Sequence, residues 1–327
     1  MTDQEERLSQ ALRAARMYYY QDMTTEAIAT ALEVSRSTVS RLLSYAKERG
    51  LVEIRVVDPQ GQSHKLARKL QDHFEVRQVH VVTVPEQAGE QEWLEQVALF
   101  AAHYLNTLVK PHTILGLAWG TTVSAIARHL VPKQTTNVDV VQLNGAGNTQ
   151  RLGIAYASEI VMRFAENYGA RPHLFPVPTF FDFPETKEAL WRERSIRRIL
   201  ELQERADILL FSVGAVESGV PSYVYSGGYL ESRDYAKLEA EEVVGDIATV
   251  FFRADGSYRD IPINQRASGP DLAQFSRAAH SLCVVSGRGK AVGLRAALQG
   301  GYVTDLIVDE PTARLLLELP APVATVG

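Results

Sequence analysis

The 327-residue sequence has a single cysteine, no apolar run long enough to span a membrane, and no apolar signal segment at its polar, acidic beginning. One thiol excludes a framework of disulfides within the chain and a cysteine-rich metal site, and it fits a reducing cytosol. We therefore expect a cytoplasmic protein without a membrane partner. Cys283 lies in the apolar run Ser-Leu-Cys-Val-Val, which predicts a buried structural thiol.

Motifs of several enzyme and metal-site classes are also missing. The sequence contains neither G-x-x-x-x-G-K-S/T nor G-x-S-x-G, and its histidines show no spacing typical of metal ligands. Residues 287–293 resemble a dinucleotide-binding fingerprint, with Asp309 at about the right distance. The third glycine is one position late, however, and the ~35 residues that follow are too few for a dinucleotide-binding half. We expect no metal and no cofactor.

The composition is that of an ordinary globular protein, with 46% hydrophobic and 22% charged residues. At ~150 residues per domain, the length predicts two domains. The formal net charge is −5. Residues 1–57 contain equal numbers of acidic and basic side chains, so the negative excess belongs to the rest of the chain.

Residues 24–57 have the pattern of a helix–turn–helix that is followed by a strand. Thr24 or Thr25 can cap a first helix that ends near residue 32, and Ser35 can cap a second helix that ends before Gly50. Residues 51–57 then alternate apolar and polar side chains, which predicts a one-sided strand resembling a wing. A preceding helix at 5–20 is expected to pack on this pair through Leu8, Leu12, Ala15 and Tyr19.

The second helix of the pair has two distinct faces. Its apolar stripe consists of Val39, Leu42, Leu43 and Ala46, at the spacing of a buried helix face. The opposite face is small, hydroxylated and basic, so it could enter a major groove and contact base edges and phosphates. The residues predicted to bind DNA are Ser35, Arg36, Ser37, Thr38, Ser40, Arg41 and Ser44.

The alternative is an ordinary helical hairpin with a solvated polar face. The capped turn, the Ser-Arg-Ser-Thr start and the hydroxyl and arginine face occur together, which favours DNA binding. Because residues 1–57 carry no net charge, affinity for DNA must come from local placement of basic groups and from two or more copies of the chain.

Beyond the turn-forming segment 58–62, strands and helices alternate. This alternation predicts a mainly parallel sheet with helices on both faces, and residues 214–247 are expected to be irregular, with 218–230 as a lid. The expected domains are a helix–turn–helix domain at 1–57, a linker at 58–62 and an effector-binding and oligomerisation domain at 63–327. The expected helices cover 63–74, 90–109, 122–131, 153–168, 185–203, 270–279, 289–299 and 310–318, and the expected strands cover 76–84, 113–119, 138–143, 208–213, 248–253, 282–285 and 305–308.

A ligand of such a sheet binds beyond the carboxyl ends of the strands. Four glycine-containing loops are expected there, at 120–122, 144–148, 214–219 and 286–290. Glycines admit close approach to the backbone, and helix N-termini carry partial positive charge. We therefore predict two phosphate cradles, Gly120-Thr121-Thr122 and Gly289-Lys290, with Asp246 placed to accept hydrogen bonds from sugar hydroxyls. A plain helix cap and a solvated lysine are the alternative interpretation of each cradle.

Several motifs occur in the order found in one family. They are the helix–turn–helix above, the run ILGLAWGTT, the segment VVGDIATVFFRADG, the residues Ile263-Asn264-Gln265-Arg266 and the run GKAVGLRAALQGGYVTDLIVDEPTARLL. Together they resemble the SorC/DeoR-type sugar-binding transcriptional regulators of bacteria, over nearly the full length. The resemblance implies a helix–turn–helix domain, which the strand at 51–57 would make winged, followed by an α/β effector domain with a sugar-phosphate isomerase-like (Rossmann-like) fold. It also implies operator DNA, a phosphorylated sugar and a homo-oligomer, dimer or tetramer, as partners.

The resemblance assigns roles to residues of the loops. Gly120, Thr121, Thr122 and Lys290 would contact the phosphate, and Gly145 and Asp246 would lie near the sugar. Some members carry a basic residue near the position of Asn144. An asparagine can form neither a Schiff base nor a charge pair, so covalent capture of an aldehyde is not expected. The predicted effector-binding residues are Gly120, Thr121, Thr122, Asn144, Gly145, Glu217, Asp246 and Lys290.

Two functions remain open at this stage. The first is a transcriptional regulator of a carbohydrate or polyol catabolic operon, a repressor rather than an activator, controlled by a phosphorylated sugar. The second is a sugar-phosphate isomerase with a fused DNA-binding domain, which needs a general base near the substrate. Asp246 and Glu217 are the carboxylates expected near the loops, and no loop contains a histidine partner, so binding without turnover is favoured.

Overall fold

The computed structural model describes residues 3–52, 61–133, 135–148, 152–215 and 222–320. Contacts within the chain define two compact units, residues 1–59 and 60–327, each of which is described by itself. Most of the predicted wing strand at 51–57 and of the predicted linker at 58–62 lies outside the described residues, so the wing and the exact domain boundary stay predictions.

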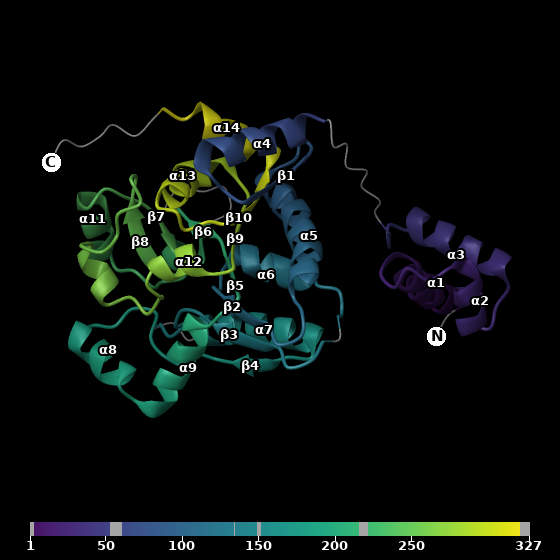
Figure 1. Cartoon of the computed structure of the whole chain (residues 1–327), viewed down its shortest axis with the longest axis horizontal. Coiled ribbons are helices and arrows are strands. Elements are labelled where there is room, and N and C mark those ends of the chain that lie inside the picture. The colour runs from purple at the N-terminus through teal and green to yellow at the C-terminus, as the bar shows by residue number, and fades with distance from the viewer. Residues whose placement is uncertain (1–2, 53–60, 134, 149–151, 216–221, 321–327) are drawn as a thin grey trace. The chain divides into compact units, whose positions relative to one another are not determined.

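The first unit is helical. Helix α1 (Asp3–Tyr19) packs with α2 (Thr25–Ala31) and α3 (Arg36–Glu48), as Figure 1 shows. Both predicted caps form. Thr24 Oγ1 accepts a hydrogen bond from Ala27 N at 3.2 Å, and Ser35 Oγ accepts one from Thr38 N at 3.1 Å. These two caps fix where α2 and α3 begin, and so confirm the helix–turn–helix.

The packing face of α1 differs from the prediction. Leu8 and Leu12 are 40% and 36% exposed, whereas Ala11, Ala14 and Ala15 are buried against the other helices. Small side chains let two helix backbones approach closely, so the alanine face rather than the leucine face makes the contact. The predicted packing of Leu8 and Leu12 was therefore wrong.

The second unit contains a seven-stranded sheet whose neighbouring strands are all parallel, in the order β1-β10-β9-β5-β2-β3-β4. The register pairs Leu210 with both Leu117 and Leu282 in the middle of the sheet. This confirms the predicted parallel sheet. Its strands are β1 (Gln78–Val82), β2 (Ile114–Leu117), β3 (Asp139–Gln142), β4 (Arg171–His173), β5 (Ile208–Phe211), β9 (His280–Val285) and β10 (Asp305–Asp309).

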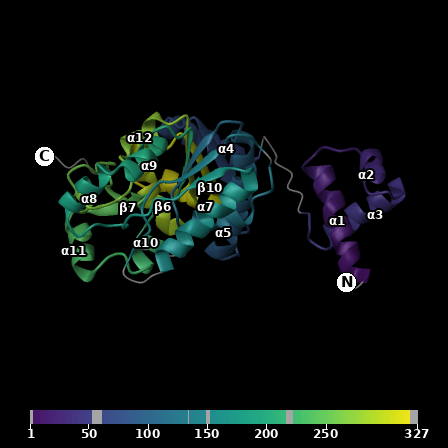
Figure 2. The same cartoon turned by 90° about the horizontal axis from the view of Figure 1, so that it is seen from below.

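Successive residues of the central strands pack in two separate cores, one on each face of the sheet. Leu210 packs in one core, and its neighbours Leu209 and Phe211 pack in the other. Helices on both faces bury the strands, which is why the strands are apolar without alternation. On one face lie α5 (Glu90–Leu108), α6 (Thr121–Arg128) and α7 (Leu152–Tyr168), and on the other lie α4 (Gln62–Phe74), α13 (Ala291–Gln299) and α14 (Glu310–Glu318) (Figures 1 and 2).

The predicted helix at 185–203 is two helices, and the short edge strand β4 was not predicted. Helix α8 ends at Trp191 and α9 begins at Arg194, and the pair packs on a small core of its own around Phe175 and Phe181. Cys283 is fully buried, as predicted. The remaining helices are α8 (Pro184–Trp191), α9 (Arg194–Glu204), α10 (Tyr223–Ser226), α11 (Ser232–Ala240) and α12 (Ala273–Arg277), with 3-10 turns η1 (Pro262–Gln265) and η2 (Arg288–Lys290).

The strand predicted at 248–253 does not join the parallel sheet. It is β8 (Val250–Arg253) of a separate antiparallel sheet with β6 (Val213–Gly214) and β7 (Val243–Ile247). Ala248 and Thr249, with φ of 48° and 70°, form the turn between β7 and β8. Such turns usually contain Asn or Gly, so this hairpin had no sequence signal. The prediction that 214–247 is irregular was wrong, since that segment includes two helices and β7.

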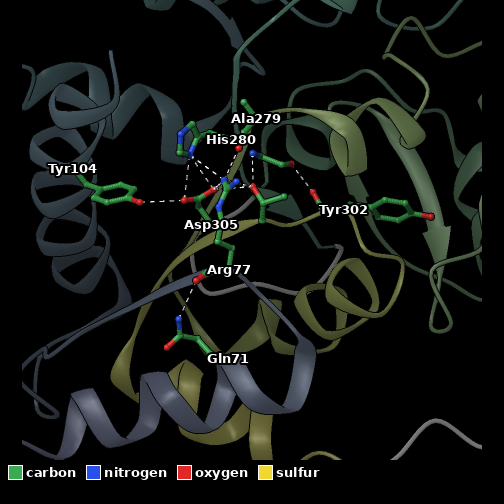
Figure 3. A network of polar contacts seen from close by, with 9 residues as sticks. Gln71, Arg77, Tyr104, Ala279, His280, Tyr302 and Asp305 are labelled. Carbon is green, nitrogen blue, oxygen red and sulfur yellow. Dashed lines mark hydrogen bonds and ion pairs between the residues drawn. The ribbon is translucent and has the colours of Figure 1, made fainter. Parts of the chain in front are cut away.

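A polar network closes the amino-terminal edge of the parallel sheet, where β10 begins (Figure 3). The Asp305 carboxylate is buried, and it accepts hydrogen bonds from Arg77 Nη2 at 2.6 Å and from the Tyr104 hydroxyl at 3.1 Å. Although burial opposes it, hydrogen bonds from Thr304 and Arg77 lower the pKa of Asp305. The network ties β1, β9 and β10 together at the edge opposite the predicted ligand loops.

Candidate functional sites

The predicted DNA-binding residues lie together on α3. Ser35, Arg36, Ser37, Ser40, Arg41 and Ser44 are exposed and Thr38 is half-buried. The opposite face of α3 is buried through Val39, Leu42, Leu43 and Ala46, as predicted. Arg41 extends along the helix, with Nε 3.4 Å from Ser37 O and Nη2 3.4 Å from Thr38 Oγ1. A second arginine, Arg36, lies 3.2 Å from the exposed Glu26 carboxylate. The arrangement presents a hydroxyl and arginine surface at the start of α3.

A cavity of about 50 Å³ lies beyond the carboxyl ends of the strands of the second unit. Thr122 and Gly145 do not line it, and Glu217 lies outside the described residues. Residues that were not predicted to bind the effector also line it, among them Trp119, Ser212 and Thr249. The cavity joins five of the predicted effector-binding residues: Gly120, Thr121, Asn144, Asp246 and Lys290.

The first turn of α6 faces the cavity. Gly120 follows β2, and Ser124 N donates to Gly120 O at 2.9 Å, which closes the first turn of the helix. Gly120, Thr121 and Val123 line the cavity, whereas Thr122 is only 2% exposed. The end of the helix that carries partial positive charge is thus directed at this space, as an anion-binding site requires.

In the loop that contains the second predicted cradle, Gly289-Lys290, two backbone amides just before the cradle donate to carboxylates of the protein itself. Gly287 N donates to Asp309 Oδ2 at 2.9 Å, and Arg288 N donates to Glu90 Oε1 at 3.0 Å. Lys290 N donates to Gly287 O at 3.1 Å. The N–H groups of Gly287, Arg288 and Lys290 therefore already have acceptors, and Lys290 lines the cavity.

Lys290 is buried, with 4% exposure, in acidic surroundings. Burial lowers the pKa of its ammonium group, while Asp246, Glu90 and Asp309 are among the neighbours that oppose this shift. A buried ammonium group needs a partner of opposite charge. An anion held between Lys290 and the start of α6 would be such a partner.

Asp246 lies on β7 and is 4% exposed. Its Oδ2 accepts from Thr249 N at 3.1 Å, and its Oδ1 makes no well-formed hydrogen bond among the described residues. A Cβ at Gly214 would come within 1.9 Å of that Oδ1, so the carboxylate needs glycine beside it. Burial raises the pKa of Asp246 to about 6, although the Thr249 amide, the nearby Tyr225 hydroxyl and Lys290 lower it.

The pKa of Asp246 predicts a change in stability with pH. The folded-state pKa of about 6 lies above the ordinary value of 3.8, so the folded protein binds more protons between these values and stability falls as pH rises through them. We expect Asp246→Asn to remove this fall and to be more stable than wild type at pH 7.5 by up to ~3 kcal/mol. Denaturant unfolding of both proteins at pH 4.5 and pH 7.5 measures this. Equal stability of the two proteins at pH 7.5 would contradict it.

Asn144 has a fixed backbone and an unpaired side chain. Its backbone carbonyl oxygen accepts hydrogen bonds from Trp119 Nε1 at 3.1 Å and from Gln142 Nε2 at 2.7 Å. The residue is 1% exposed and lines the cavity, yet neither polar atom of its side chain has a hydrogen-bond partner among the described residues. Each unpaired buried polar group costs ~1–3 kcal/mol, which a hydroxylated ligand in the cavity could offset.

The next residue, Gly145, anchors this loop to the rest of the protein. Its N–H donates to Ser268 Oγ at 2.9 Å, and its carbonyl accepts from Thr179 Oγ1 at 2.9 Å. A Cβ at this position would lie 2.5 Å from the carbonyl oxygens of Val177 and Pro178. The glycine is therefore required for packing, and its own polar groups are already bonded within the protein.

Gly145→Ala is expected to lower the free energy of unfolding by ~2–4 kcal/mol, because backbone atoms on both sides cannot move away from the new methyl group. Thermal unfolding of the variant measures the loss. Gly89→Ala is the control, since nothing lies within 4 Å of a Cβ at Gly89. A Gly145→Ala protein as stable as Gly89→Ala would contradict the expectation.

Aromatic side chains cover the cavity on the side of the predicted lid. Trp119 lies 5.1 Å from Tyr229 between ring centroids, and Tyr156 lies 4.6 Å from Tyr223. Asn148 Nδ2 donates to Gly227 O at 3.0 Å, which ties this segment to the loop that carries Asn144. The sequence offered one signal for this cluster, the tyrosines and glycines of 218–230.

Two kinds of feature are missing from the described residues, a membrane-spanning helix and a cluster of metal ligands. In the described part of the chain, no helix is long and apolar enough to cross a membrane. The same residues contain no group of three or more His, Cys, Asp or Glu side chains that could hold a metal ion.

Comparison with known proteins gives two matching family models. Residues 58–318 match the model described as “Putative sugar-binding domain”, and residues 6–49 match that of region 4 of sigma-70. The chain is 37% identical over 309 residues to the deoxyribonucleoside regulator of Bacillus subtilis (strain 168), a match that covers 94% of this chain and 96% of the relative.

Solved structures agree with these matches. A crystal structure of a domain of a possible sugar-binding transcriptional regulator from Arthrobacter aurescens TC1 is similar, with a TM-score of 0.74 and 48% identity, over 80% of this chain and 100% of that one. The full-length sorbitol operon regulator SorC from Klebsiella pneumoniae is similar over 95% of this chain and 99% of its own, with a TM-score of 0.70 and 26% identity.

Proposed function

This chain belongs to the SorC/DeoR-type sugar-binding transcriptional regulators, and we propose that a monophosphorylated sugar or polyol, bound in the cavity of the second unit, controls its affinity for operator DNA. The observation that carries the proposal is the composition of the cavity wall. The N-terminal end of α6 and a buried lysine line the same cavity as Asn144 and Asp246, which have unpaired polar atoms.

The number of phosphate groups follows from the donors that are available. Lys290 and the start of α6 can serve one phosphate together. Gly287 and Arg288 already donate to Asp309 and Glu90, so a second phosphate bound by these two amides would have to displace a carboxylate of the protein. The hydroxyls of the effector would then bond with Asn144 and Asp246. The names of two relatives, a deoxyribonucleoside regulator and a sorbitol operon regulator, agree with such a ligand class.

The cavity is too small for the effector, so binding of the effector requires a conformational change. The cavity of about 50 Å³ is smaller than a sugar phosphate. The effector therefore binds a more open arrangement, in which the aromatic side around Tyr223 has moved outward. A ligand changes DNA affinity only through its different affinities for two arrangements, and this opening supplies the second one.

We propose binding without turnover. No histidine lines the cavity in the part of the chain that the structure describes, and Asp246 is its one lining carboxylate there. An isomerase needs a base and a proton donor beside the substrate. Conversion of one sugar phosphate into another by the purified protein would favour the enzymatic alternative.

The proposal also includes the oligomeric state of the protein and whether it represses or activates transcription. Since residues 1–57 have no net charge, we propose that the protein binds DNA as a dimer or tetramer in the cytoplasm, with two copies of α3 at successive half-sites. We also propose repression, in which the effector releases the protein from its operator.

A thermal-shift screen of the full chain tests the effector class. Sugar and polyol phosphates are compared with their unphosphorylated forms. At 100 times its dissociation constant, a ligand should stabilise the folded state by ~2.7 kcal/mol. A response to a monophosphate but not to its free sugar is expected. Stabilisation by the free sugar alone would contradict the phosphate-binding role of Lys290 and α6.

A further inference from the structure

A second and larger hollow lies in the same unit, away from the cavity described above. It is a groove of about 460 Å³ between the α8–α9 helix pair and the segment that contains η1 and α12. Its rim carries three cationic side chains, Lys187, Arg259 and Arg277. Three buried polar residues form its floor, Gln203, Ser268 and Gln274, with exposures of 2%, 1% and 8%.

The cations of the rim are incompletely paired. Arg259 lies 3.8 Å from Asp271, whose carboxylate also accepts hydrogen bonds from Ala273 N and from the Tyr258 hydroxyl. Within the described ranges, Lys187 and Arg277 form no ion pair within 4 Å. Burial lowers the pKa of Lys187, with the charge of Glu188 opposing, so an anion in the groove would stabilise its charged form. Glu204, which also lines the groove, could accept hydrogen bonds from hydroxyls.

The floor of the groove is hydrogen-bonded directly to the loop that carries Asn144. Gln203 Nε2 donates to Gln142 O at 2.8 Å and to Leu143 O at 3.2 Å. Gln274 donates to the carbonyl oxygen of Gln203, which positions that residue. On the other side, Ser268 Oγ accepts from Gly145 N at 2.9 Å. The backbone at 142–145 is thus held by groove residues, while Asn144 lines the effector cavity.

We propose that this groove is a second binding site, for a small phosphorylated molecule, and that its occupancy acts on the effector cavity through the segment 142–145. The first part is independent of the proposed function, and the second part rests on it. A ligand that draws Lys187 and Arg277 together would move α8 relative to α12, and the hydrogen bonds of Gln203 and Ser268 would transmit that movement. By linkage, the effector would alter affinity at the groove by the same factor.

The first test uses inorganic phosphate as the probe and the full chain with Lys290→Met, which removes the cation of the effector cavity. Thermal shift is measured at constant ionic strength with chloride as the reference. We expect a saturable rise in Tm that is lost when Lys187→Gln and Arg277→Gln are added. The matched control adds Arg192→Gln and Arg194→Gln, which remove two exposed charges near the same helix pair without lining the groove, and it should keep the rise.

Absence of a saturable rise in the Lys290→Met protein would overturn the second site. So would an equal rise in the variant lacking Lys187 and Arg277. Neither result bears on the proposed function, because a Lys290-dependent response of the wild type to a sugar phosphate would still stand. Conversely, a phosphate response that depends on the groove would remain if the sugar-phosphate screen failed.

The second test reads the coupling by fluorine NMR of 5-fluorotryptophan-labelled protein in the Lys290→Met background. The chain has three tryptophans. Trp191 lines the groove, and Trp119 Nε1 donates hydrogen bonds to the backbone carbonyls of Asn144 and Gly145. Phosphate should shift both resonances with one midpoint and leave that of Trp93 unchanged. Both shifts should disappear without Lys187 and Arg277. A shift of Trp191 alone would overturn the coupling and leave the second site intact.

Discussion

Replacing Lys290 with methionine should reduce affinity for the phosphorylated effector by ~30-fold or more, because removal of one partner of a buried charge pair costs ~2–5 kcal/mol. Lys290 is the cationic residue that lines the cavity, and the Gly287 and Arg288 amides of its loop already donate to Asp309 and Glu90. Helix α6 alone would then hold the phosphate. Methionine keeps the length and apolar stem of lysine, so the packing of the buried chain is retained.

Calorimetric titration with the best monophosphate of the screen measures this loss, and operator binding without effector should stay as in wild type. Lys69→Met, at an exposed position of α4, is the matched control and should bind the effector normally. An unchanged effector affinity in Lys290→Met would move the phosphate away from this cavity. A changed operator affinity without effector would mean that Lys290 also determines the resting conformation.

Arg41→Ala should weaken operator binding strongly and leave effector binding unchanged. An arginine that contacts a base edge contributes ~1–3 kcal/mol of discrimination, and a dimer loses that contact twice, so a decrease of ~30-fold or more is expected. Arg41 is exposed on the face of α3 opposite the buried stripe, with its guanidinium near Ser37 and Thr38. Its removal should leave the fold of the first unit intact.

Fluorescence anisotropy at fixed salt measures the effect, on an operator selected from random DNA with the wild-type protein. Arg13→Ala, at an exposed position of α1, is the matched control for loss of one positive charge. If both variants lose the same affinity for operator and for random DNA, then Arg41 contributes charge rather than recognition. If Arg41→Ala binds as wild type, α3 contacts DNA through its other residues.

Local pattern in the sequence determined the helix–turn–helix and the parallel sheet. The caps at Thr24 and Ser35, and the burial of Val39, Leu42, Leu43 and Ala46, depend on residues at most a few positions apart. The central strands are likewise continuous apolar runs, and the helices between them have an apolar period of 3.6 residues. Such features are determined along the chain, and the structure confirmed them together with the burial of Cys283.

Other features depended on partners that are distant in the sequence. Glu90 reaches the amide of Arg288, 198 positions away, and this contact occupies a loop that by its own residues is a phosphate cradle. Leu8 and Leu12 have the helical spacing of a core face, yet both are exposed. Ala11, Ala14 and Ala15 pack against the other helices instead, because small side chains let α3 approach closely.

The composition of the cavity was predicted only in part, for the same reason. Lys290 and the start of α6 could be placed at one sheet edge by topology. Asp246 reaches that edge because β7 pairs with β6 in a separate sheet, through a hairpin turn at Ala248-Thr249 that has no turn signal. Local sequence encodes which residues can form a helix end or a strand, since those interactions lie within a few positions. Packing between distant segments decides that the start of α6, Asp246 and Asn144 line one cavity. That packing exists only in the folded chain.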